Sequence, residues 1–228
     1  MVLKFISKYF GKFLVSVSIS FFIFSFFMIY LADNTEAFKA SFTADKIINV
    51  MVETDGLSLE EIKTICAKNP NQESCDIINN PSKLLDEQFS PFTEKIASFR
   101  SLAVKAIPLA IIVLILGFIF IYLGTSSFAI ATYLTSLTIS IASLFSILFY
   151  KLMVFSLPDL ATNIQNTQQD VPQELLNLAI QSITEWIRVP IQKTVFLCLI
   201  LLLIFVPLAI FFYIKKRNIS KKQAEQDH

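Results

Sequence analysis

Four long apolar runs dominate the sequence, and polar segments separate them. The runs cover residues 13–31, 106–123, 128–150 and 195–214, and none of them contains a charged residue. A helix needs about 20 apolar residues to cross the hydrocarbon core of a bilayer, and each run is close to that length. The pattern therefore predicts an all-α, polytopic membrane protein with a four-helix transmembrane bundle.

The second and third runs are separated only by residues 124–127. A connection this short joins two antiparallel helices. The helical pattern starts well before the second run, with Ser90 as the expected N-cap and Pro91 as the first helical residue. One face of this helix is then marked by Phe92, Ile96, Phe99, Ala103, Ala106, Ala110 and Gly117. Because this apolar face begins so early, we expect the helix to extend beyond the bilayer.

Small residues recur every seven positions on the second helix. They are Ala103, Ala110, Gly117 and Gly124. Small residues let two helix backbones approach closely inside a membrane, and we expect the third helix to be the partner. Hydroxyl side chains share one face of that third helix, at Thr132, Ser136, Ser140 and Ser143. They favour helix packing, while a hydroxyl-lined pore in an oligomer is the alternative interpretation.

The composition agrees with a membrane protein, since 54% of the residues are hydrophobic and 23 are phenylalanine. Lys4, Lys8 and Lys12 precede the first run, as they would in a signal peptide. Cleavage after Ala32 would place Tyr30 at a position that requires a small residue, and the run is longer than a typical signal sequence. The sequence therefore predicts that residues 13–31 form an uncleaved first span.

Charge predicts the orientation of the chain. Residues 1–12 carry three lysines and no acid, and residues 215–228 carry five basic residues and two acids. Because basic segments favour the cytoplasmic side, we expect both termini in the cytoplasm of a cell-membrane protein. Residues 32–105 and 151–194 then lie outside. The basic residues of the tail are expected to contact anionic lipid headgroups; they are Lys215, Lys216, Arg217, Lys221 and Lys222.

The first outer segment contains Cys66 and Cys75, on the side expected to be oxidising. A disulfide between them would add roughly 2 to 3 kcal/mol in the chain-entropy model, enough to stabilise a small helical region. Redox exchange is the alternative, but the sequence has no CxxC motif. We therefore expect the transmembrane helices to extend into a small, disulfide-tied extracytoplasmic helical region.

The second outer segment contains an amphipathic pattern at residues 172–188, with Trp186 on its apolar side. Such a helix either lies in the headgroup layer or packs against the extended first and second helices. The second placement is favoured, because two extended helices with apolar faces need a third surface to cover them. Pro158 is expected to end the third helix before this segment, and Pro190 to kink the passage into residues 195–214.

The sequence predicts no enzyme activity. No nucleophile with a base, no paired carboxylates and no metal or cofactor motif can be assembled from it. His228 stands alone in the tail, Cys198 is expected to pack inside its span, and nucleic-acid binding is excluded by the modest charge. We expect a binding or scaffold protein, or an accessory subunit, that uses its outer helical region. Its expected partners are the lipid bilayer and either another protein or a second copy of the chain. The alternative is an oligomeric channel or transporter component lined by the hydroxyl face of residues 128–150.

Overall fold

The computed structural model describes most of the chain outside the first predicted outer segment. The described residues are 2–35, 38, 61, 64, 68, 81–167 and 173–226. Within the helices, side chains are described except at residues 81–89, 92, 157–167, 173–176, 178–179 and 219–226.

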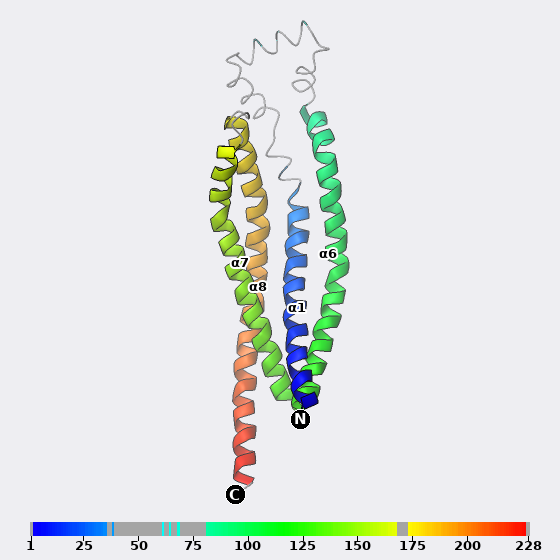
Figure 1. The fold of residues 1–228 in the computed structure, drawn as a ribbon, viewed down its shortest axis with the longest axis vertical. Coiled ribbons are helices and arrows are strands. Elements are labelled where there is room, and N and C mark those ends of the chain that lie inside the picture. The colour runs from blue at the N-terminus through cyan, green and yellow to red at the C-terminus, as the bar shows by residue number, and fades with distance from the viewer. Residues whose placement is uncertain are drawn as a thin grey trace. The chain divides into compact units, whose positions relative to one another are not determined.

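Four α-helices make up the fold of the described residues, which include no strand (Figure 1). They are α1 (Val2–Asp33), α6 (Pro81–Thr125), α7 (Phe128–Thr167) and α8 (Gln173–Gln226). Each is long and apolar enough to cross a membrane. The predicted all-α class with four membrane-crossing helices is therefore confirmed.

The helices are longer than the sequence predicted, because they continue through prolines that were expected to begin, end or kink them. α6 already begins at Pro81, so Ser90 is not its N-cap and Pro91 is not its first residue. α7 continues past Pro158 as far as Thr167, and α8 runs through Pro190 without a break. A proline removes one backbone hydrogen bond, but its φ suits a helix, so a helix can continue where other contacts stabilise it.

The predicted disulfide has no support. Cys66 and Cys75 lie outside the described residues, and no disulfide occurs among the residues that the structure does describe. Cys198 is a free thiol and is buried.

The chain divides into two compact units, and each helix contributes to both. The first unit contains Met1–Ile29, Ser101–Leu152 and Ile191–His228. The second contains Tyr30–Arg100 and Met153–Pro190.

In the first unit, α1 packs tightly against α6. A Cβ built on Gly11 would lie 2.6 Å from the carbonyl oxygen of Gly117, and one built on Gly124 would lie 2.6 Å from the backbone nitrogen of Lys8. Glycine is needed at these positions because the two backbones leave no room for a side chain. The Ser18 hydroxyl also donates a hydrogen bond to the Ala110 carbonyl, further along the same pair of helices.

This packing corrects the predicted partner of the small residues on α6. The nearest atoms to Gly117 and Gly124 belong to α1, not to the third span. The reason is that α1 has its own small residues, Gly11 and Ser18, at the same seven-residue spacing. Two faces of small residues at matching spacing let the backbones of α1 and α6 approach closely.

The predicted apolar face of α6 is correct at most positions but wrong at Phe99. Ile96, Ala103, Ala106 and Ala110 are all buried, whereas Phe99 is 55% exposed. Phe99 lies about 60° around the helix from Ile96, at the same angle as the buried Gly117, so its position on the face does not account for its exposure. The side chain of Phe92 is not among those described.

The turn between α6 and α7 brings several segments of the first unit together. The start of α7 lies beside α8, with the rings of Phe128 and Phe212 6.3 Å apart and those of Tyr133 and Tyr213 5.7 Å apart. On the other side, Gly124 contacts Lys8 of α1. The N-terminal segment, the turn and the basic part of α8 therefore lie at the same end of this unit.

Ser126 gives the turn a left-handed backbone, with φ of 52°. A β-branched residue is strained in this region, whereas asparagine tolerates it. We expect Ser126→Val to lower the free energy of unfolding by about 1 kcal/mol, and Ser126→Asn to leave it unchanged. Titration of the protein in mixed micelles with SDS measures both. Equal stability of the two variants would show that the turn does not constrain the hairpin.

In the second unit, two side-chain to backbone hydrogen bonds join the end of α1 to the first part of α8. Pro190 has no N–H to give to the carbonyl of Trp186, and the Asn34 side chain donates to that oxygen at 2.8 Å. In return, the Trp186 indole N–H donates to the carbonyl of Leu31 at 3.2 Å. The Trp186 ring also stacks on Phe38, with centroids 5.2 Å apart. Through these contacts, Trp186 of the amphipathic segment packs against the end of α1.

Arg100 and Asp33 form a salt bridge at 2.9 Å in the same unit, with about half of each side chain exposed. Exposed ion pairs contribute little because water and salt screen them. We expect Arg100→Gln to lower the free energy of unfolding by less than about 1 kcal/mol, and high salt to remove the difference. The measurement is the same SDS titration at low and high salt. A larger, salt-independent loss would assign Arg100 a packing role instead.

Candidate functional site

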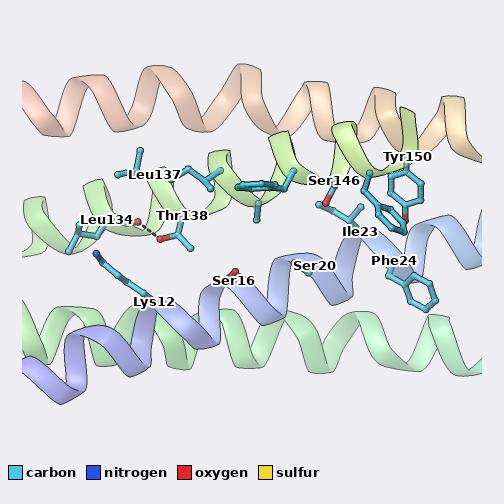
Figure 2. Close-up of a pocket in the computed structure, with 14 residues that line it drawn as sticks. Lys12, Ser16, Ser20, Ile23, Phe24, Leu134, Leu137, Thr138, Ser146 and Tyr150 are labelled. Carbon is cyan, nitrogen blue, oxygen red and sulfur yellow. Dashed lines mark hydrogen bonds between the residues drawn. The ribbon is translucent and has the colours of Figure 1, made fainter. Parts of the chain in front are cut away.

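A groove of about 690 Å³ lies between α1 and α7 in the first unit, within the usual size range of ligand sites. Figure 2 shows Lys12 at one end and Ile23, Phe24 and Tyr150 at the other. The polar side chains along it are Lys12, Ser16, Ser20, Thr138, Ser146 and Tyr150.

The groove exists because α1 presents only small side chains to the middle of α7. Ser16 and Ser20 follow Lys12 at four-residue steps and so share its face of the helix. Ala142, which is also small, lines the opposite wall. Since α1 is held close to α6 through its other face, it does not move across to fill the space.

Two buried side chains mark the Tyr150 end of the groove. Ile23 and Tyr150 are almost fully buried, and the Tyr150 ring lies 5.2 Å from that of Phe27. The side wall is open and aromatic, because Phe145 is 66% and Phe149 is 64% exposed. A ligand could therefore enter from the side, and its apolar part would cover these rings.

Lys12 makes its end of the groove cationic. Its ammonium group lies 5.4 Å from the centre of the Tyr9 ring. Lys8 and Lys216 are close enough to repel it. Apart from Glu225 and Asp227 in the tail, the residues of this unit include no acid. An anion is thus the natural counterpart of Lys12.

Hydroxyls in the groove and on the neighbouring α7 face are hydrogen-bonded in the same way. In the groove, the Thr138 hydroxyl donates to the carbonyl of Leu134 at 2.8 Å. On the predicted hydroxyl face, Thr132 donates to the carbonyl of Phe128 and Ser140 to that of Ser136, both at 2.9 Å. These three hydroxyl groups therefore donate to backbone carbonyls of α7 itself, as is typical of hydroxyl residues in packed helices.

Three of the four predicted hydroxyl residues are buried within the single chain: Ser136, Ser140 and Ser143. Ser143 Oγ and its neighbour Thr135 Oγ1 are buried without a hydrogen-bond partner among the described residues. In the same chain, Ala103 and Ala110 are buried on α6. The small and hydroxyl residues predicted to pack helices therefore lie mostly inside the protein.

The basic residues predicted to contact lipid lie on α8 near the turn. The Lys215 ammonium lies 5.9 Å from the Phe212 ring and that of Lys216 5.4 Å from the Tyr133 ring. Arg217 is exposed, while the side chains of residues 221 and 222 are outside those described. The aromatic rings keep the first two ammonium groups close to the apolar surface.

The contribution of α1 to the close contact with α6, and to the groove beside α7, was not predicted from the sequence. Gly11 and Ser18 match the spacing of the small residues on α6, and this match was the available signal. Lys12 was treated only as a charge before the first span. Its position four residues before Ser16, and eight before Ser20, places a cation and two small hydroxyl residues on one face.

Among the described residues, no group of three His, Cys, Asp or Glu side chains is placed to hold a metal ion. The four apolar helices define the class of the protein, which is an all-helical, multi-pass membrane protein. No family model, curated protein or solved structure matches the chain.

Proposed function

We propose that the protein is a non-enzymatic membrane protein that binds a membrane-soluble ligand in the groove between α1 and α7. The groove is the observation that carries this proposal, because it has an apolar, laterally open wall, a cationic end and an opposite end where Ile23 and Tyr150 are buried. Its polar groups are suited to holding a ligand in place. The protein would act as a scaffold or accessory subunit whose behaviour depends on what the groove holds.

We further propose that both termini lie in the cytoplasm of a cell-membrane protein. The N-terminal lysines, the turn and the basic part of α8 lie at one end of the first unit, and basic residues favour the cytoplasmic side. The Lys12 end of the groove would then face the cytoplasmic leaflet.

The expected protein partner belongs to the outer helical region. Residues 39–60 and 69–80 of that region are outside the described part of the chain. The capping contacts of Trp186 and Asn34 support a helical arrangement where the outer segments begin. Binding of another protein, or of a second copy, there stays a prediction.

The hydroxyl-lined pore is less well supported than ligand binding. A pore needs hydroxyls that face water, and Ser136, Ser140 and Ser143 are buried inside one chain. Two of the four hydroxyls on that face also bond to their own helix. This environment favours helix packing.

The proposal is tested by filling the groove. Native mass spectrometry of the full chain released from membranes is expected to show a bound small molecule, which Ser20→Phe removes by placing a ring between α1 and α7. Val17→Phe is the matched control, because Val17 is exposed on α1 and does not line the groove. A molecule retained equally by both variants, or none on the unmodified chain, would overturn the proposed function.

A further inference from the structure

We propose that the occupant of the groove is an anionic phospholipid, with its headgroup at Lys12 and one acyl chain between α1 and α7. This inference rests on the proposed function and names the ligand class. It follows from the charge at one end of the groove, from the chemistry of its walls and from its length.

The charge around Lys12 selects a negative headgroup. Lys8 and Lys216 lie close enough to repel Lys12, so an anion placed there relieves repulsion among three cations. Within this unit the only acids in the sequence are Glu225 and Asp227 in the tail, and no acid lines the groove. Each lysine near a membrane surface favours an anionic lipid several-fold over a neutral one.

The walls of the groove suit an acyl chain. Phe24, Phe145 and Phe149 are more than half exposed, and each of them lines the groove. Burial of apolar surface by a hydrocarbon chain is favourable without any directional contact. The small residues Ser16 and Ser20 leave the width that such a chain needs.

The length of the groove argues for a lipid rather than for a helix of a second copy. Lys12 and Ile23 are 11 positions apart on α1, which corresponds to roughly 16 Å. Leu134 and Tyr150 are 16 positions apart on α7, roughly 24 Å, which is still shorter than a hydrocarbon core of about 30 Å. Half of a hydrocarbon core is about 15 Å thick. The groove thus accommodates one leaflet's acyl chain and stops at Ile23 and Tyr150, whereas a membrane-crossing helix would have to continue past them.

The test uses the full chain in nanodiscs containing equal amounts of phosphatidylglycerol and phosphatidylethanolamine with identical acyl chains. Native mass spectrometry is expected to show retained phosphatidylglycerol in at least fivefold excess. Lys12→Gln should reduce this excess about fivefold, whereas Lys12→Arg should keep it. Lys151→Gln is the control, because Lys151 follows Tyr150 at the other end of the groove and does not line it.

Three outcomes would overturn the inference. Equal retention of the two lipids would show that the groove does not select an anionic headgroup. If that lipid were still lost with Ser20→Phe, the proposed function would stand. Anionic lipid that survives Ser20→Phe but not Lys12→Gln would place the headgroup outside the groove. A dimer that excludes lipid and dissociates with Ser20→Phe would assign the groove to a second copy. The inference predicts loss of retained lipid in Ser20→Phe and loss of the phosphatidylglycerol excess in Lys12→Gln, with neither effect in Lys151→Gln.

Discussion

Gly117→Leu is expected to lower the free energy of unfolding by about 3 kcal/mol, because it forces α1 and α6 apart. Even a Cβ at this position would lie 2.8 Å from a methyl group of Val15 and 3.0 Å from the Gly11 carbonyl oxygen. The helices cannot relieve such contacts by a small shift, since Gly11 meets the α6 backbone just as closely. SDS titration of the purified protein measures the loss.

Two variants make this prediction specific. Gly117→Ala should lower the free energy of unfolding by less than Gly117→Leu does. Adding Val15→Ala to Gly117→Ala should recover part of that loss, because it removes the methyl group that the new Cβ meets first. Ile119→Leu is the control for a change of side chain on α6, because Ile119 is exposed. A stability of Gly117→Leu close to that of the control would contradict the tight pairing of α1 with α6.

Trp186→Ala is expected to produce the second large effect, a loss of about 2 to 3 kcal/mol. The change removes both the ring that stacks on Phe38 and the indole N–H that donates to the Leu31 carbonyl. It would also loosen the end of α1, because the adjacent Asn34 side chain donates to the Trp186 carbonyl.

Trp186→Phe separates the two contributions. It keeps an aromatic ring against Phe38 but removes the donor, so it should cost only about 1 kcal/mol. Limited proteolysis near residue 38 would measure the local stability, and SDS titration would measure the global stability. Equal values for the two variants would mean that the hydrogen bond, and not the ring, determines the stability.

The four helices could be predicted from the sequence because each contains an uncharged run of nearly membrane-crossing length. Their ends could not be predicted, since proline was expected to end or kink them. At Pro190 the structure shows why α8 continues: the carbonyl that the proline leaves without a donor accepts a hydrogen bond from Asn34 of another segment. This contact joins residues more than 150 positions apart in the sequence and is invisible in any local pattern.

The packing of the helices was predicted only in part. The small residues of α6 were correctly recognised as suited to close contact, but their partner depends on a match between two distant faces. The turn makes α7 the neighbour of α6 in sequence, while Gly11 and Ser18 make α1 the better fit in space. Exposure of Phe99 shows a related limit, because spacing gives the angle of a residue on a helix but not whether a neighbour covers the helix at that level.

The groove could not be predicted because it depends on the absence of side-chain volume. Ser16 and Ser20 look like ordinary small residues of a span, and only the pairing of α1 with α6 turns them into the floor of a site beside α7. The same pairing of α1 with α6 places Lys12 at one end of the groove. The ligand proposal therefore depends directly on the position of α1.

Cysteine crosslinking tests that position most directly. In a chain whose three native cysteines are replaced, Ser18→Cys combined with Ala110→Cys is expected to form a disulfide in membranes, because the Ser18 hydroxyl bonds to the Ala110 carbonyl. Ala110→Cys combined with Ser143→Cys, which would face each other if α6 packed along α7, should stay reduced. Crosslinking of the second pair and not of the first would contradict the pairing of α1 with α6, and with it the groove.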